Sequence, residues 1–261
     1  MIVYSYIIPY ARLCQEFYKK IPALFVFSHR IWYSDSMEMM IADRVCDLYP
    51  NEEKTAPLVI VPVFKRVGEE ICRLIREKTD EAFTLLTIGC PRWNHDLTPW
   101  KQDAIFKNDG CYDGEADVFL REITSLILPK IKKKTGISPE KTILCGHSLA
   151  GLFALYAGFV CDAFDGIVSV SGSLWYPGFS EFAREKTLSQ SVRYVYLALG
   201  QRESLTKHPL LRTVEKKTRE ISTSLCDKGI PATLEIHDGG HFDDPNDRIA
   251  QGIARSLTKV F

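Results

Sequence analysis

The chain has 261 residues, enough for one large domain or two small ones, and 46% of them are hydrophobic, as is usual for a folded soluble protein. Its 33 basic and 33 acidic residues give no net charge, which argues against a general nucleic-acid-binding protein. No apolar run reaches the 18 or more residues that span a membrane. The eight cysteines are scattered without a C-x-x-C pair, which favours a reducing cytoplasm over a disulfide framework or a zinc site.

Regular structure is expected from about residue 39. We therefore predict an N-terminal segment of uncertain role over 1–38 and a single domain over 39–261. The N-terminus lacks a basic region ahead of an apolar block, so no secretory signal is expected. An edge strand is predicted over 42–49. The apolar, β-branched run 56–64 predicts a strand buried on both faces, and 68–80 has the apolar spacing of a helix.

Strands and helices alternate along the rest of the chain. Further strands are predicted over 82–89, 141–145, 166–172, 193–200 and 232–237, and further helices over 114–134, 149–158, 209–229 and 245–259. This alternation indicates the α/β class, with a mostly parallel central sheet and helices on both of its faces.

Ser148 lies where the strand 141–145 gives way to the helix 149–158, in the sequence GHSLA (146–150). The nucleophile elbow of α/β-hydrolases reads G-x-S-x-G, so only the last residue differs. Small residues are needed there because the strained turn brings the helix close to the strand, and alanine adds only a methyl group. We predict that Ser148 is a nucleophile. The alternative is a glycine-serine turn without chemistry.

A nucleophilic serine needs a histidine to take its proton and a carboxylate to orient that histidine. In α/β-hydrolases the chain order is serine, acid, histidine. His241 fits this order, because it lies on a glycine-containing loop after the last predicted strand. His147 is adjacent to the serine, and its side chain is expected to point away from the site. Glu203, which follows the strand 193–200, is the best candidate for the acid, and three aspartates are alternatives: Asp162, Asp165 and Asp238.

An oxyanion hole must hold the tetrahedral intermediate. One donor is expected to be the backbone N–H of Leu149, directly after the nucleophile. The second is expected after the first buried strand, at Phe64 or Lys65, and the sequence does not choose between them. No metal and no organic cofactor are expected, because the chain contains no H-E-x-x-H, Walker lysine or G-x-G-x-x-G motif.

Five segments, taken in order, resemble the putative-esterase branch of the α/β-hydrolases, which includes esterase D-like enzymes and siderophore esterases. They are RWNHDLTPW (92–100), GHSLAGLFALYA (146–157), VSGSLWYPGF (170–179), LALGQRES (197–204) and DGGHFDDPNDRIAQGI (238–253). The resemblance covers roughly residues 39–261, and 1–38 have no counterpart in it. It implies an α/β-hydrolase fold with Ser148 as nucleophile, His241 as base and Glu203 as acid. Members of the branch vary in the acid, and some work with a Ser-His pair.

The resemblance also implies where the substrate binds. The segment 92–100 follows the second buried strand, at the edge where α/β sheets bind ligands. Trp93 and Trp100 are expected to wall an acyl or aromatic pocket, Arg92 to meet an anionic group, and Trp175 to complete a lid. For each tryptophan, packing of the loop alone is the alternative.

The function expected from these residues is that of a cytoplasmic serine esterase. It would cleave a small-molecule carboxylic ester, such as an acylated sugar or a siderophore-type lactone, through an acyl-serine intermediate. Two alternatives are an acyltransferase with the same triad and a catalytically inactive, hydrolase-like binding module. The sequence does not indicate the natural substrate or the oligomeric state.

Overall fold

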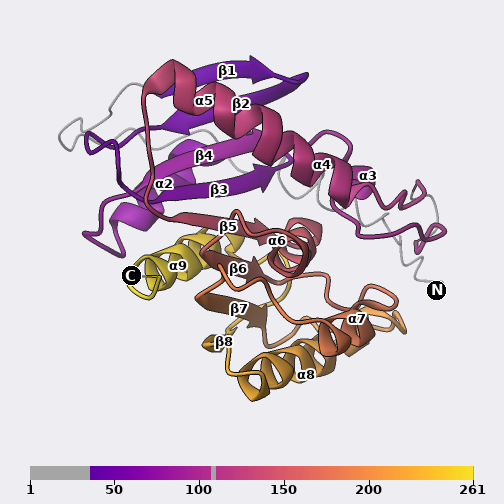
Figure 1. Ribbon diagram of the computed structural model, residues 1–261. Coiled ribbons are helices and arrows are strands. Elements are labelled where there is room, and N and C mark those ends of the chain that lie inside the picture. The colour runs from indigo at the N-terminus through magenta and orange to yellow at the C-terminus, as the bar shows by residue number, and fades with distance from the viewer. Residues whose placement is uncertain (1–35, 107–109, 261) are drawn as a thin grey trace, which may run out of the picture.

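The computed structural model describes residues 36–106 and 110–260, which form one eight-stranded sheet flanked by helices (Figure 1). The strands are β1 (Met37–Ile41), β2 (Arg44–Tyr49), β3 (Leu58–Val63), β4 (Thr84–Gly89), β5 (Thr142–His147), β6 (Gly166–Val170), β7 (Tyr194–Gly200) and β8 (Ala232–His237). Their order across the sheet is β1-β2-β4-β3-β5-β6-β7-β8. The six neighbouring strands β4, β3, β5, β6, β7 and β8 are parallel to one another, and β2 pairs with β4 in antiparallel fashion. The predicted mostly parallel sheet is confirmed.

The sheet begins earlier than the sequence indicated. β1 and β2 form a hairpin whose turn residues, Ala42 and Asp43, both have positive φ angles, of 52° and 57°. β1 is therefore the edge strand, and the strand predicted over 42–49 lies second. The predicted boundary after residue 38 falls inside β1. Residues 1–35 lie outside the described part of the chain.

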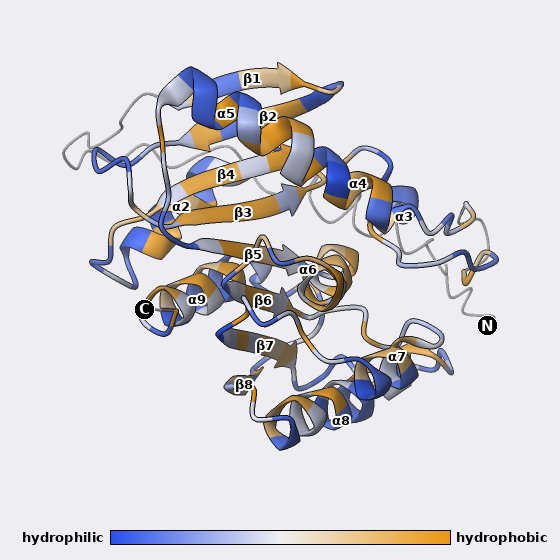
Figure 2. Ribbon diagram, in the orientation of Figure 1, coloured by the Kyte–Doolittle hydropathy of each residue, from blue (hydrophilic) through white to orange (hydrophobic). Residues whose placement is uncertain are grey.

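Helices cover both faces of the sheet. They are α2 (Gly68–Arg76), α3 (Trp93–Asp96), α4 (Ala116–Glu122), α5 (Leu128–Thr135), α6 (Leu149–Val160), α7 (Phe179–Glu185), α8 (Val214–Asp227) and α9 (Pro245–Leu257). α2 and α9 pack together on one face, and α4 to α8 cover the other (Figure 1). Figure 2 shows that β3 and α6 are mainly apolar, whereas α8 has one apolar and one polar side. The difference follows from burial, because α6 is enclosed and α8 faces water on one side.

Alternate residues of the central strands enter two separate hydrophobic cores. In β3, Leu58 and Ile60 join the core under α6, whereas Val59 and Val61 join the core under α9. This period of two is the geometry of a strand, and burial on both faces explains the unbroken apolar run.

The helix predicted over 114–134 is instead divided in three. A π-helical turn over Ile123–Ile127 separates α4 from α5, and Pro129 lies in the first turn of α5. A proline ring clashes with the carbonyl group four residues earlier in a regular α-helix, and the wider turn directly before Pro129 relieves that conflict. Within the described ranges, no helix has both the length and the apolar character to cross a membrane.

Candidate active site

Ser148 occupies a strained turn between β5 and α6. Its φ and ψ angles are 62° and −124°, a combination that non-glycine residues rarely adopt. A Cβ atom added to Gly146 would lie 2.2 Å from the backbone carbonyl of Ala150, which is closer than any real contact. Ala150 itself is fully buried, so its methyl group is accommodated against Gly146. The strand, the strained serine and the following helix form the geometry of a nucleophile elbow.

The structure brings Ser148, His241 and Glu203 together at the carboxyl edge of the sheet. The Ser148 hydroxyl Oγ lies 3.1 Å from Nε2 of His241, and Nδ1 of His241 lies 2.7 Å from Oε2 of Glu203. Each side chain comes from the loop after a different parallel strand, β5, β7 or β8, so the strand ends place all three at one edge. The carboxylate accepts from Nδ1–H, which leaves Nε2 to accept the hydroxyl proton.

Glu203 is buried, with only 3% of its side chain exposed, and its second oxygen is also bound. Oε1 accepts hydrogen bonds from the Ser171 hydroxyl at 2.6 Å and from the Gly200 N–H at 2.6 Å, and the Arg248 guanidinium lies 3.5 Å away. Burial by itself raises the pKa of Glu203, but the charge of His241 and the hydrogen bonds outweigh it and lower the pKa to about 2. The acid is therefore held as a carboxylate.

Sequence reasoning missed Ser171 and Arg248 as partners of the acid. Ser171 follows β6 with a positive φ of 46°, and Arg248 lies in α9 with 3% of its surface exposed. Arg248 also donates from one guanidinium nitrogen to the backbone carbonyl of Asp238, at 2.8 Å. Both residues lie in segments that carry the family resemblance, 170–179 and 238–253, but their contact with Glu203 forms only once β6, β7 and α9 are packed together.

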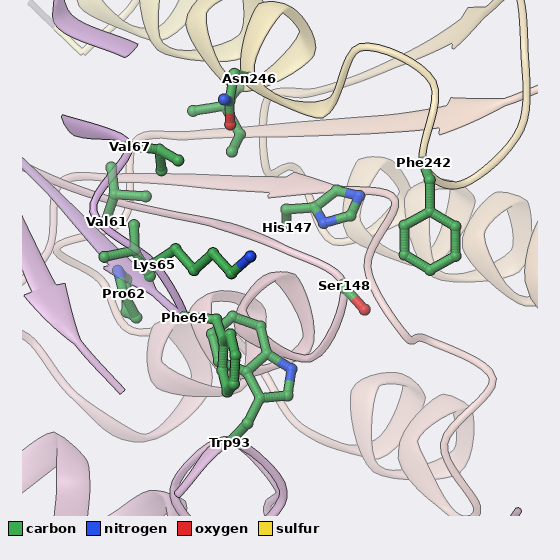
Figure 3. A pocket seen from close by; sticks show the side chains of 12 residues that line it. Val61, Pro62, Phe64, Lys65, Val67, Trp93, His147, Ser148, Phe242 and Asn246 are labelled. Atoms are coloured by element: carbon green, nitrogen blue, oxygen red, sulfur yellow. The ribbon is translucent and has the colours of Figure 1, made fainter. Parts of the chain in front are cut away.

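The expectation that His147 points away from the site is wrong. Its side chain lines the pocket beside Ser148 (Figure 3), and Nε2 lies 3.0 Å from the backbone carbonyl oxygen of His241. The carbonyl can only accept, so Nε2 carries a proton and donates. Burial, followed by the charge of His241, lowers the pKa of His147 to about 3. His147 is therefore a neutral donor that supports the His241 loop.

A pocket with about 630 Å³ of empty space, its open mouth included, lies beside the Ser148 hydroxyl. Its lining is mainly aliphatic and aromatic, with four polar residues: Val61, Pro62, Val63, Phe64, Lys65, Val67, Trp93, His147, Ser148, Phe242, Asn246 and Ile249. Trp93 and Phe64 meet edge to face, with ring centroids 5.9 Å apart. An apolar hollow with a few polar groups is typical of a small-molecule site.

A second hollow lies on the other side of His241 and holds about 650 Å³ of empty space, again with its mouth included. It is lined by Trp175, Arg202, Glu203, Leu205, Thr206, Leu211, Val214, His241 and Phe242. Phe242 lines both hollows and so stands between them. Trp175 reaches the second hollow from a buried position, where it packs edge to face against Phe106.

Arg92 and Trp100 line neither of these two hollows. The Arg92 guanidinium pairs with Asp96 at 2.9 Å and lies 3.5 Å from Glu115. Trp100 donates from Nε1 to the backbone carbonyl of Pro177 at 2.9 Å, and its ring packs against the aromatic residues Tyr176, Phe179 and Phe182. In the structure both residues anchor loops.

The candidate oxyanion donors lie next to the nucleophile. Leu149 is the first residue of α6, directly after Ser148, and both Phe64 and Lys65 line the same pocket as the serine. Phe64 and Lys65 thus both remain candidates for the second donor. Across 36–106 and 110–260, no group of three or more histidine, cysteine or acidic side chains is arranged to hold a metal ion.

Comparison with known proteins places the chain in a family. The model of the family described as "Putative esterase" matches residues 65–243, more than half of the chain. The chain is 28% identical over 150 residues to "Uncharacterized protein YbbA" of Bacillus subtilis, covering 56% of this chain and 60% of that protein. It is 32% identical over 143 residues to a siderophore enterobactin esterase of Emericella nidulans, covering 51% of this chain and 42% of that protein. The matched regions thus span less than two thirds of both relatives.

Solved structures share the fold. An IroE-like serine hydrolase from Shewanella oneidensis superimposes with a TM-score of 0.70, covering 86% of this chain and 80% of that one at 16% identity. At so low an identity the likeness concerns the fold alone, and it confirms the predicted α/β-hydrolase architecture.

Proposed function

Because the chain belongs to the putative esterase family, we propose that it is a serine hydrolase of small-molecule carboxylic esters. The observation that carries the proposal is the continuous contact from Ser148 Oγ through the His241 ring to Glu203, at 3.1 and 2.7 Å. A scaffold that only binds ligands has no need for a strained serine, an oriented imidazole and a buried carboxylate in one line.

In this proposal Ser148 attacks the ester carbonyl while His241 takes its proton at Nε2. Glu203 stays ionised and stabilises the imidazolium. The backbone N–H groups of Leu149 and of Phe64 or Lys65 hold the oxyanion. His241 then gives the proton to the leaving alcohol, which leaves an acyl-serine. Water, deprotonated by the same imidazole, hydrolyses that intermediate and restores the serine.

The two hollows support separate binding places for the alcohol part and the acyl part of the substrate. The leaving oxygen receives its proton from His241, so the alcohol part is assigned to the hollow that contains His241 and Trp175. The acyl part is assigned to the pocket that contains Ser148, Phe64 and Trp93. Siderophore-type lactones, which the name of the Emericella relative suggests, and acylated sugars are the first natural ester classes to test.

The remaining features of the proposal concern the chain as a whole. The predicted single catalytic domain is supported by one continuous sheet from β1 to β8, with its start moved from residue 39 to Met37, where β1 begins. A cytoplasmic location is supported by the free thiols of buried cysteines such as Cys46, Cys90 and Cys145, which suit a reducing compartment.

Fluorophosphonate labelling tests the proposal directly. We expect the wild type to be labelled and to hydrolyse p-nitrophenyl esters, and both activities to be lost in Ser148→Ala and His241→Ala. A folded wild-type protein that takes no label and turns over no ester would refute the proposal and favour the inactive binding module. Faster product formation with an added alcohol would favour an acyltransferase.

A further inference from the structure

Two buried polar atoms in the pocket beside Ser148 have no hydrogen-bond partner among the described residues. They are the amide oxygen Oδ1 of Asn246 and the indole nitrogen Nε1 of Trp93. Buried polar groups are nearly always satisfied, so an unpaired acceptor and an unpaired donor in one mainly apolar pocket call for an explanation. Both atoms lie where the acyl part of the substrate is assigned.

Asn246 cannot satisfy its oxygen by turning the amide over. Its nitrogen Nδ2 donates to Oε2 of Glu70 at 2.8 Å, and a carboxylate can only accept, so the nitrogen must face α2. Asn246 lies in the first turn of α9 and is 94% buried, since only 6% of its surface is exposed. Figure 3 shows the amide oxygen on the side of the pocket, facing the space that Lys65 also enters.

Trp93 presents the complementary group. Its ring is held edge to face by Phe64, and Figure 3 shows the indole nitrogen on the side of the ring toward Ser148. The indole N–H can only donate. A ligand that satisfies this pocket therefore offers an acceptor near Trp93 and a donor near Asn246.

A hydrocarbon acyl chain would fill the space but leave both atoms unpaired, which weakens binding of the transition state. A hydroxyl group both donates and accepts, so it suits the pocket at either point. We propose that the protein prefers esters whose acyl group carries a hydroxyl, which donates its hydrogen bond to Oδ1 of Asn246. The inference rests on the proposed esterase function and specifies its substrate class.

The test compares p-nitrophenyl esters that differ only in the acyl group. The 3-hydroxybutyrate is measured against the butyrate and the 6-hydroxyhexanoate against the hexanoate, each corrected for spontaneous hydrolysis. We expect at least one hydroxylated ester to have a kcat/KM about tenfold above its plain counterpart, the factor that one net hydrogen bond supplies. The 3-methoxybutyrate separates hydrogen bonding from inductive activation. It has a similar electron-withdrawing oxygen, which can accept from Trp93, but no donor for Asn246, so its kcat/KM should fall well below that of the 3-hydroxybutyrate.

Three variants connect the preference to the pocket. Asn246→Leu keeps the volume and removes the acceptor, so the ratio of hydroxylated to plain ester should fall to near one. Trp93→Phe keeps an aromatic ring without the N–H and should lower the ratio as well. Thr218→Val is the matched control. It removes the hydroxyl of a buried threonine in α8, outside the pocket, that has no partner in the described part of the chain, and should leave the ratio as in the wild type.

Two results would overturn the inference. One is a wild type that is labelled by fluorophosphonate and hydrolyses hydroxylated, methoxylated and plain esters equally well. The other is a hydroxyl preference that survives unchanged in Asn246→Leu. A wild type that is neither labelled nor active on any ester would instead refute the proposed function itself, so the two failures are distinguishable.

Discussion

His147 donates a hydrogen bond from Nε2 to the backbone carbonyl of His241 over 3.0 Å, so the residue before the proposed nucleophile supports the loop of the proposed base. The centroids of the two imidazole rings lie 4.8 Å apart, and the buried His147 ring lines the pocket beside Ser148. The support acts through the backbone of His241, which leaves both ring nitrogens of His241 for Ser148 and Glu203.

We expect His147→Leu to lower kcat/KM for p-nitrophenyl butyrate by roughly tenfold, because loss of one positioning hydrogen bond lets the His241 loop shift. His147→Gln should stay within about threefold of the wild type, because its amide N–H can still donate. Steady-state kinetics of both variants check this. Equal loss in the two variants would mean that the hydrogen bond is not what matters.

The pKa of His147 also predicts how stability depends on pH. Folding lowers this pKa from its ordinary value of 6.5 to about 3, so between these values the unfolded chain binds a proton that the folded chain does not. The free energy of unfolding of the wild type should therefore fall, relative to His147→Gln, as the pH is lowered from 6.5 toward 3. Urea unfolding at pH 7, 5.5 and 4 measures this. A difference between the two proteins that is constant with pH would contradict it.

Glu203→Gln should remove the carboxylate that orients and stabilises the imidazolium. We expect kcat at pH 7 to fall on the order of 10³-fold or more, with the fold retained. The pKa of Glu203 is lowered from 4.5 to about 2, so its contribution to stability is complete above pH 4.5 and is lost as the pH falls toward 2. The free energies of unfolding of the wild type and Glu203→Gln should therefore approach each other as the pH is lowered from 4.5 toward 2. A kcat within threefold of the wild type would point to another acid.

Ser171 holds the second oxygen of Glu203, and a nearby serine provides a matched control. Ser171→Ala should lower kcat about tenfold, because the carboxylate loses a short hydrogen bond that fixes its orientation. Ser173 is equally buried but its hydroxyl has no partner among the described residues, so Ser173→Ala should leave kcat unchanged. The kcat of each variant on one p-nitrophenyl ester is compared. Equal effects of the two substitutions on kcat would contradict a role of Ser171 in orienting Glu203.

The tight turn at Ser148 predicts how the side-chain size at positions 146 and 150 affects the stability of the protein. Gly146→Ala should destabilise the fold by more than about 2 kcal/mol or prevent folding, because its Cβ would lie 2.2 Å from the Ala150 backbone. Ala150→Gly restores the usual pattern and should keep activity while costing about 1 kcal/mol of helix stability. Thermal unfolding and esterase assays of both variants provide the test. A fully stable Gly146→Ala protein would show that the turn is looser than the structure has it.

The sequence by itself determined the strands from β2 onward, most of the longer helices and the position of Ser148, because hydrophobic period and the small residues of an elbow are local properties. It also indicated His241 and Glu203, since loops that follow parallel strands meet at one edge of the sheet. The sequence did not indicate where the sheet starts, because β1 is a short edge strand that is recognised only by its pairing with β2 in the folded hairpin. It did not indicate the short helices α3 and α7 either.

Only the tertiary structure decided what surrounds these residues. The hydrogen bond of His147 to the His241 loop, the contacts of Ser171 and Arg248 with Glu203, and the hydrogen bond from Asn246 to Glu70 all join segments far apart in the chain. Their partners are chosen by how β6, β7, α2 and α9 pack, and no local spacing encodes that packing. A buried polar side chain takes whichever partner the packed elements bring within hydrogen-bond distance, so its role becomes visible only in the folded protein.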